Sequence, residues 1–171
     1  MAAAAFEILD WRRFDVFALL ALRGVATVEQ VMAPACEDGL RRRGYPLVAL
    51  DFAAGIGPAV AELGRMLKWR ERFGYDLAPA SRNLDALRDG FDFDVADGGG
   101  CVLLLRSFAQ AWREDEAWCR GLLGIVSERS LQELALGRRF FAVLVLADAA
   151  APLVGQALEG HVIPSPWSGP F

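Results

Sequence analysis

The sequence contains few of the residues on which most enzyme active sites depend. Its 171 residues include one histidine, His161, and three cysteines. A metal site with two histidines is therefore excluded, and a Ser–His or Cys–His nucleophile pair would have to use His161. The string G-x-S-x-G, which is typical of a nucleophilic serine on a strand-to-helix turn, does not occur. We therefore expect a protein that is not an enzyme and that needs no metal or cofactor.

The sequence also lacks long apolar runs, a basic leader and an excess of positive charge. The longest apolar runs, such as 140–147, fall far short of the roughly 20 residues that a membrane-spanning helix needs. Residues 1–10 lack the basic stretch of a secretion signal. Acidic residues outnumber basic ones by 22 to 18, which disfavours contact with nucleic-acid phosphates. We expect no membrane partner and no nucleic-acid partner.

The cysteines indicate the compartment. Cys36, Cys101 and Cys119 are scattered along the chain and form no C-x-x-C pair. An odd number of separated cysteines favours buried thiols in a reducing environment over a disulfide framework. We therefore expect a cytoplasmic protein.

Short apolar runs alternate with longer helical patterns. The runs that we expect to be strands are 16–22, 46–52, 101–106 and 140–146. They are nearly continuous in apolar residues, which is typical of strands that are covered on both faces in a parallel sheet. The order of elements predicts the α/β class, with a small, mostly parallel sheet of four strands flanked by helices.

Capping residues, glycine and proline predict where the helices begin and end. Thr27 and Gln30 resemble a capping box at the start of a helix over 27–43, which Pro34 would kink and Gly44 would end. Further helices are expected from Pro58 onward, over 83–91 and over 115–136, the last with a second capping box at Ser130. Residues 152–171 are rich in proline and form a tail that is either flexible or laid across the domain.

The most informative segment is NLDALRDGFDFDVAD, residues 83–97. Asn83 suits the first position of a helix. From there Leu84, Leu87 and Phe91 recur at the spacing of a buried stripe. Asp85, Asp89 and Asp92 form a second stripe beside the first.

This segment also holds the surplus charge of the chain. Residues 85–97 contain five aspartates and one arginine, a net charge of −4, which equals that of the whole chain. One interpretation is a solvated face in which Arg88 pairs with Asp85 and Asp92. The other is a protein interface, because Phe91, Phe93 and Val95 alternate with the acidic residues and aromatic side chains often anchor interfaces.

A glycine-containing turn leaves a small-molecule alternative open. Gly55 and Gly57 follow a predicted strand and open a predicted helix, as at the start of a dinucleotide fingerprint. Val60 stands where a third glycine is expected, and the acid about 20 residues further on would be Asp76, which falls in a predicted loop. Two glycines at such a turn are also typical of a tight turn without a ligand.

The string Asn83-Leu84-Asp85-Ala86-Leu87-x-Asp89 is similar to the signature of the barstar family, intracellular inhibitors of secreted ribonucleases. The resemblance extends over 44–147 and includes the core strand at 44–51, the first helix at 57–69 and the pair Phe73-Gly74. Residues 1–43 resemble an N-terminal strand–helix extension of longer relatives. The resemblance implies a barstar-like domain over 1–151, followed by the tail at 152–171.

In that family, the helix and the loop before it plug the ribonuclease active site. The resemblance implies that Asp89 is the central carboxylate, that Asp85 flanks it, and that Asn83 fixes the loop. The chain departs from the pattern in an insertion at 75–82 and at Arg88, where the family often has an aromatic residue. Gly90 stands where the family usually has a cysteine, and Phe93 is the nearest residue to a tryptophan that the family often has after the helix. The acidic contact that the family makes from its last helix has no clean match, and Glu133 is the acidic residue closest to that position.

These patterns predict a non-catalytic inhibitor or immunity protein that blocks a basic toxin nuclease, with a secreted ribonuclease as the expected partner. The predicted partner-binding surface comprises Tyr75, Asn83, Asp85, Arg88, Asp89, Asp92, Phe93 and Asp94. The alternatives are a regulatory module of the same fold that binds another basic protein, and a protein that binds a nucleotide or other small molecule at the Gly55 turn.

Overall fold

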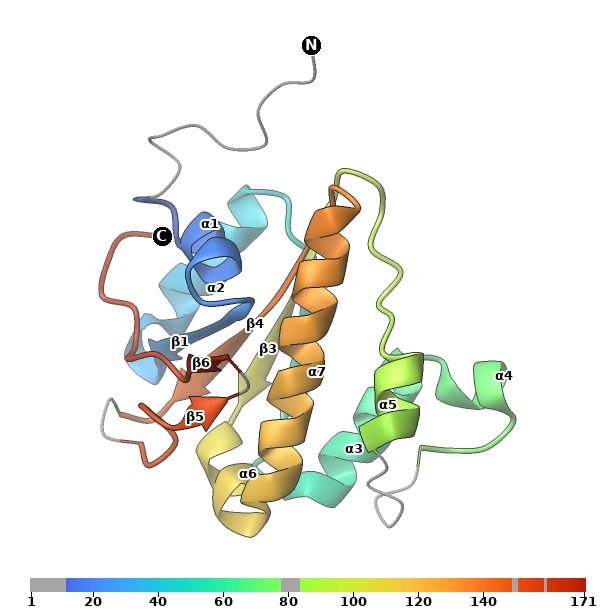
Figure 1. The fold of residues 1–171 in the computed structure, drawn as a ribbon. Helices are drawn as coiled ribbons and strands as arrows, with labels where there is room; N and C mark the ends of the chain where they lie inside the picture. Colours follow the sequence, from blue (N-terminus) through green and yellow to red (C-terminus); the bar gives the residue numbers. More distant parts are fainter. Residues whose placement is uncertain (1–11, 78–83, 149–150, 159) are drawn as a thin grey trace.

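The computed structural model of the chain describes residues 12–77, 84–148, 151–158 and 160–171. The elements are α1 (Phe14–Leu20), β1 (Val25–Glu29), η2 (Gln30–Met32), α2 (Ala33–Arg42), β2 (Leu47–Asp51), α3 (Ile56–Met66), α4 (Trp69–Phe73), α5 (Leu84–Gly90), β3 (Gly100–Arg106), α6 (Phe108–Glu114), α7 (Glu116–Ala135), β4 (Arg139–Leu146), β5 (Ala157–Leu158) and β6 (His161–Val162) (Figure 1). None of the helices in these ranges is long and apolar enough to cross a membrane.

The main sheet has four strands in the order β1-β4-β3-β2, and every neighbouring pair is parallel. Leu103 of the inner strand β3 lies opposite Ala142 on one side and Val48 on the other. The predicted α/β class, with a four-stranded parallel sheet flanked by helices, is confirmed. β5 and β6 form a separate antiparallel pair.

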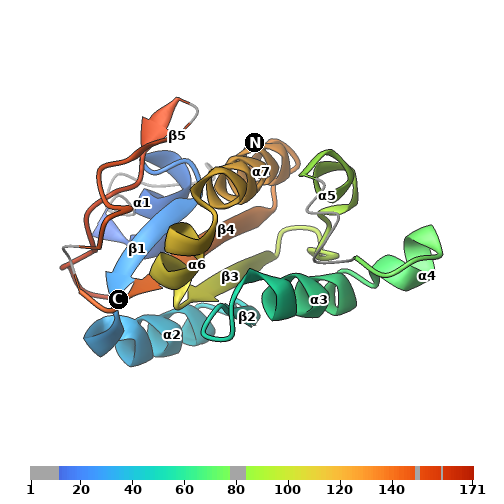
Figure 2. The same ribbon diagram turned by 90° about the horizontal axis from the view of Figure 1, so that it is seen from below.

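Each face of the sheet has its own apolar layer, because successive side chains of a strand point to opposite faces. Phe141 and Val143 of β4 pack with residues of α1 and α2. Phe140, Ala142 and Leu144 pack with residues of α3, α5 and α7. α2 and α7 accordingly lie on opposite sides of the sheet (Figure 2). The burial of both faces explains why the inner strands are continuous apolar runs.

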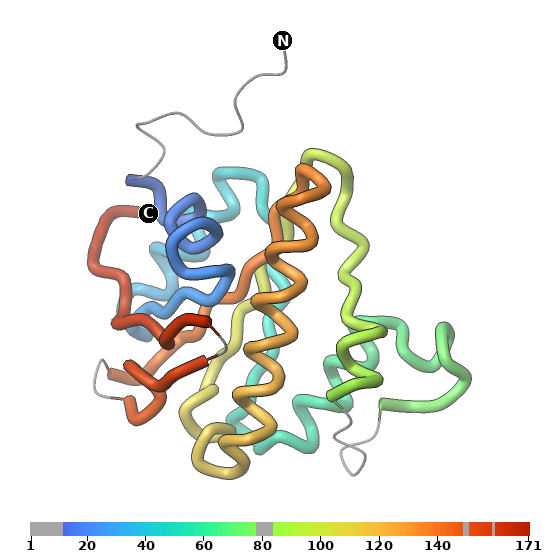
Figure 3. The backbone as a smooth tube through the Cα atoms, in the orientation of Figure 1, coloured from blue at the N-terminus to red at the C-terminus, as the bar shows by residue number. Residues whose placement is uncertain are grey.

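The described part of the tail lies across the domain beside β1 and α1 (Figure 3). The backbone N–H of Trp167 donates to the carbonyl of Thr27 at 2.8 Å, and the Thr27 hydroxyl donates to the carbonyl of Pro164 at 3.0 Å. The rings of Trp167 and Phe171 meet Phe14 at centroid distances of 5.6 and 5.2 Å. The tail therefore covers the edge strand β1, whose free backbone groups would otherwise invite pairing with another chain.

The structure corrects the N-terminal elements. The segment 16–22, predicted as a strand, lies mostly in helix α1, and the fourth strand is β1. A short apolar run fits a buried helix as well as a buried strand, so the pattern alone does not separate the two. Thr27 belongs to β1 instead of capping a helix. Pro34 occupies the first turn of α2, where proline is tolerated, and therefore does not kink it.

Other boundaries follow the local chemistry. Asp115 begins α7 by accepting a hydrogen bond from the backbone N–H of Trp118 at 3.0 Å. Ser130 lies inside this continuous helix, so the predicted restart there is wrong. The short helices α4 and α6 were not predicted. The three cysteines are buried, and burial raises the pKa of Cys36 to about 12 and that of Cys101 to about 11.

Candidate protein-binding surface

Helix α5 is fixed against the core by its apolar stripe. Leu87 and Phe91 are buried, and the Phe91 ring lies 5.9 Å from that of Phe140 on β4. Leu84 packs against α7 at Gly121, where an added Cβ would overlap the end of the leucine side chain. The predicted buried stripe is therefore present. Asn83, the expected first residue of the helix, lies outside the described residues.

The acidic stripe divides into an exposed part and a paired part. Asp89 is exposed, and the side chain of Asp85 is 93% exposed. Asp92 instead lies between two arginines, with Arg129 at 3.0 Å and Arg72 at 4.0 Å. The predicted stripe assumed helical rotation through position 92, but α5 ends at Gly90. Asp92 therefore lies beyond the end of the helix that carries Asp85 and Asp89.

Most of the remaining surplus charge is balanced within the protein. Asp94 lies 3.8 Å from Lys68, and Asp97 lies 3.7 Å from Arg138. Arg88 pairs with Glu128 at 3.0 Å and with Asp85 at 3.6 Å. The predicted pair of Arg88 with Asp85 is therefore present, whereas Asp92 pairs with other arginines. Exposed pairs of this kind contribute little stability.

Asp89 differs from the other acidic residues of the segment. It forms no ion pair with any residue that the structure describes. Its charge is therefore available to another molecule without first breaking an internal contact.

Aromatic side chains of α4 and the following loop lie beside the end of α5. Trp69 is buried, whereas Phe73 and Tyr75 are 40% and 52% exposed. The Phe73 ring lies 4.4 Å from that of Trp69, and the Tyr75 ring lies 6.2 Å from it, between centroids. The buried indole therefore supports two exposed rings. α4 and α5 lie together at one side of the molecule, away from the tail (Figures 1 and 3).

Gly90 is the point where α4 and α5 meet. An added Cβ at this position would lie 2.9 Å or less from atoms of the Trp69 and Phe73 rings. Arg72 also donates to the Gly90 carbonyl at 3.2 Å. The close approach explains why a glycine stands where the barstar pattern has a cysteine. We call the exposed set Phe73, Tyr75, Asp85, Arg88 and Asp89 the α4–α5 surface.

Two residues of the barstar comparison lie within the fold. Phe93 is half-buried and stacks on Phe140, with 5.6 Å between ring centroids. Glu133 is buried and forms ion pairs with Arg129, at 2.7 Å, and with Arg138. Neither side chain stands on the surface beside Asp89. Conversely, Phe73 was not among the predicted site residues, although its spacing of four from Trp69 places both rings on one side of a helix.

The Gly55 turn is closed by the protein's own side chains. Gly55 has a φ of +93° and precedes α3. The backbone N–H of Ile56 donates to Oε2 of Glu114, on α6, at 3.0 Å. A carboxylate of the chain thus occupies the place at the helix start where a nucleotide phosphate would bind. Among the described residues, no group of three or more His, Cys, Asp or Glu side chains is arranged to hold a metal ion.

Searches of protein-family models, of curated proteins and of solved structures found no match to this chain. The similarity to the barstar family therefore rests on the residues of the sequence.

Proposed function

We propose that this protein is a non-catalytic inhibitor, or immunity protein, that blocks a basic toxin nuclease through the α4–α5 surface. One observation carries the proposal: the exposed rings of Phe73 and Tyr75 are supported by buried Trp69 beside the exposed carboxylates of α5. Interfaces commonly combine such aromatic anchors with charged residues around them. The sequence similarity to ribonuclease inhibitors supports the same surface.

The chemistry of this surface suits a cationic partner. A ribonuclease active site binds phosphate through basic side chains, and a carboxylate can accept the same charge-assisted hydrogen bonds. Asp89 is the candidate for the central contact because it is exposed and forms no internal ion pair among the described residues. The Asp85 side chain is 93% exposed and lies 3.6 Å from Arg88. Binding through Asp89 therefore requires little rearrangement of the free protein.

The proposal is tested by Asp89→Ala with Asp97→Ala as the matched control. Both variants remove one exposed aspartate from the same acidic segment, but Asp97 lies away from α5. We expect Asp89→Ala to weaken binding by about 2–5 kcal/mol, because the cation of the partner is left buried and unpaired. We expect Asp97→Ala to change affinity by less than about 0.5 kcal/mol. The measurement is calorimetric titration against a partner captured by wild-type protein from the native host.

The nuclease activity of the captured partner decides between the two classes of function that use this surface. Inhibition of its nuclease activity by the wild type, relieved in Asp89→Ala, agrees with the proposal. A captured partner without nuclease activity would favour the regulatory module. Equal losses of affinity in Asp89→Ala and Asp97→Ala would contradict the assignment of the α4–α5 surface.

A further inference from the structure

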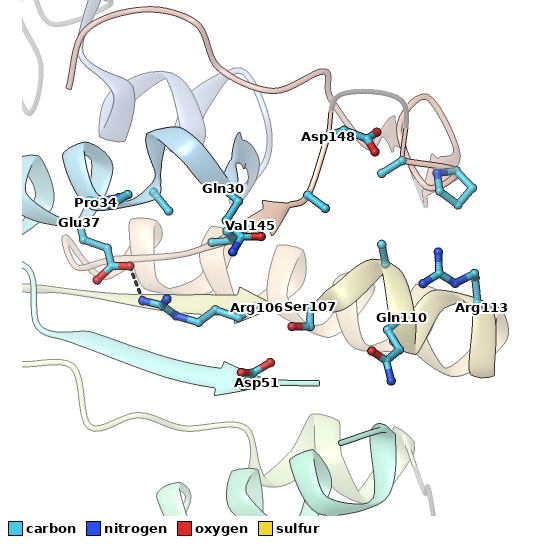
Figure 4. A pocket seen from close by; sticks show the side chains of 15 residues that line it. Gln30, Pro34, Glu37, Asp51, Arg106, Ser107, Gln110, Arg113, Val145 and Asp148 are labelled. Carbon is cyan, nitrogen blue, oxygen red and sulfur yellow. Dashed lines mark hydrogen bonds and ion pairs between the residues drawn. The ribbon is translucent and has the colours of Figure 1, made fainter. Parts of the chain in front are cut away.

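A cavity of about 560 Å³ opens at the carboxyl ends of the parallel strands. Asp51 and Arg106, the last residues of β2 and β3, line it together with Gln30, which follows β1, and Val145 of β4 (Figure 4). The remaining walls come mainly from α2 and α6, and no lining residue belongs to α4 or α5. Its volume suits a small molecule. Open parallel sheets commonly bind ligands at this edge, where the connections after neighbouring strands diverge.

Cationic donors face this cavity from two elements. Arg106 extends from the end of β3 and forms an ion pair with Glu37 of α2 (Figure 4). A guanidinium has five N–H donors in a planar fork, and the Arg106 side chain is 40% exposed, so donors remain for a ligand. Arg113 enters the same cavity from α6. It is exposed and forms no ion pair within the described ranges. Figure 4 shows Arg106 extending toward Glu37 and Arg113 on the far side of Ser107 and Gln110, so the two guanidinium groups are separate positions, each of which favours an anionic group.

Ser107 adds a hydroxyl at the same place. It joins β3 to α6 with a φ of +56°, a backbone conformation that residues other than glycine adopt rarely. Its side chain forms no hydrogen bond with the residues that the structure describes. The turn therefore holds a hydroxyl beside Arg106 that no contact within the described fold occupies.

Asp51 adds the opposite charge. Its Oδ1 accepts the backbone N–H of Ala53 at 2.9 Å, which fixes the carboxylate at the end of β2. The side chain is exposed and lies near Arg106 in the cavity (Figure 4). An anionic ligand alone would be repelled by this carboxylate. A ligand that also carries a protonated amine would pair with it.

We propose that this cavity binds a small zwitterion, with its carboxylate or phosphate at Arg106 and its ammonium group at Asp51, which lies opposite Arg106 on the neighbouring strand. This site is separate from the α4–α5 surface and does not depend on the proposed inhibitory function. Ligand and protein partner would contact different elements of the fold.

The test is calorimetric titration of the full chain with O-phosphoserine, which carries an ammonium group, a carboxylate and a phosphate. Serine, phosphoethanolamine and inorganic phosphate complete the set of probes. We expect O-phosphoserine to bind more tightly than inorganic phosphate, because only the former can pair with Asp51. Serine and phosphoethanolamine then show whether the carboxylate or the phosphate is the anchored group.

Three variants locate the binding. Arg106→Gln should weaken O-phosphoserine at least about tenfold, because a charge-assisted contact is lost. Asp51→Asn should weaken O-phosphoserine but leave inorganic phosphate unchanged or bound more tightly, and its amide oxygen can still accept the Ala53 N–H. Arg42→Gln, at the opposite end of α2 from the cavity, should change neither. Asp51 and Arg42 are exposed and Arg106 is half-buried, so the unfolding temperature of each variant, measured beside the wild type, shows whether a loss of affinity has a structural cause.

The proposal is overturned if none of the four probes binds at about 10 mM, which corresponds to less than about 3 kcal/mol of binding free energy. It is also overturned if O-phosphoserine binds no more tightly than inorganic phosphate. The same holds if Asp51→Asn or Arg106→Gln leaves the affinity for O-phosphoserine unchanged.

Discussion

Asp15 and Asp89 are aspartates on two seven-residue helices, α1 and α5. Asp15 is 1% exposed, and its carboxylate lies 2.7 Å from Arg13, 4.0 Å from Arg43 and 2.9 Å from the hydroxyl of Tyr45. Asp89 is exposed and has no ion-pair partner among the described residues. A buried carboxylate must find charged and hydrogen-bonding partners, whereas an exposed one need not. The difference separates an aspartate that holds the fold together from one that can bind another molecule.

The environment of Asp15 keeps it charged. Burial alone would raise the pKa of Asp15, but hydrogen bonds from Arg13 and Tyr45 and the charges of Arg13 and Arg43 outweigh burial and lower it. Burial, followed by the negative charge of Asp15, raises the pKa of Tyr45. The cluster joins α1 to the segment that enters β2, so it is a link between distant parts of the chain.

The largest expected effect is on stability. Asp15→Ala should lower the free energy of unfolding by about 3 kcal/mol, because it leaves the buried Tyr45 hydroxyl and two arginines without their common partner. Asp89→Ala should change it by less than about 0.5 kcal/mol, as is usual for exposed substitutions. Urea denaturation of the two variants beside the wild type measures both. Similar losses in the two variants would show that the buried and the exposed aspartate contribute equally to stability.

The contribution of Asp15 to the free energy of unfolding depends on pH. Because the pKa of Asp15 is lower in the folded state than in the unfolded chain, its contribution is complete above the unfolded value of about 4. The contribution is lost as the pH falls from there through the folded pKa. The stability difference between wild type and Asp15→Asn should therefore be largest near neutral pH and shrink below about pH 4. Urea midpoints measured from pH 7 down to pH 3 test this, and a constant difference would show that Asp15 does not act through its charge.

Patterns local to the sequence were enough to predict most of the sheet. The inner strands β3 and β4 were recognised because both of their faces are covered, so their apolar runs are continuous. The edge strand β2 was recognised from its apolar run as well, although only Leu50 of its five residues is buried. β1 was missed because Thr27 and Gln30 imitate a helix start, whereas pairing with β4 makes that segment a strand. Pairing with a neighbouring strand therefore decided the structure of this segment, against its local capping pattern.

The site was predicted in part, for a similar reason. The spacing of Leu84, Leu87 and Phe91 fixes which face of α5 is buried. The pairing of Arg88 with Glu128 joins residues 40 positions apart, and no local spacing contains that contact. One of the three partners of Asp15 is Tyr45, which lies 30 positions away in the sequence. The buried cluster around Asp15 was therefore not predicted from local sequence patterns either.

The smallest expected effect concerns the packing of α5 against α7. Two glycines of α7, Gly121 and Gly124, allow this packing to be tested. Replacing a mid-helix glycine by alanine stabilises a helix by up to about 1 kcal/mol. At Gly124 an added Cβ meets no atom within 4 Å, so Gly124→Ala should show this gain. At Gly121 the added Cβ would displace Leu84, so Gly121→Ala should lose most or all of the gain and shift α5.

Urea denaturation of both variants, with partner affinity as a second measurement, separates the effects. Lower affinity in Gly121→Ala alone would tie the α4–α5 surface to the placement of α5, whereas equal stability and equal affinity would show that α5 is not held by this contact.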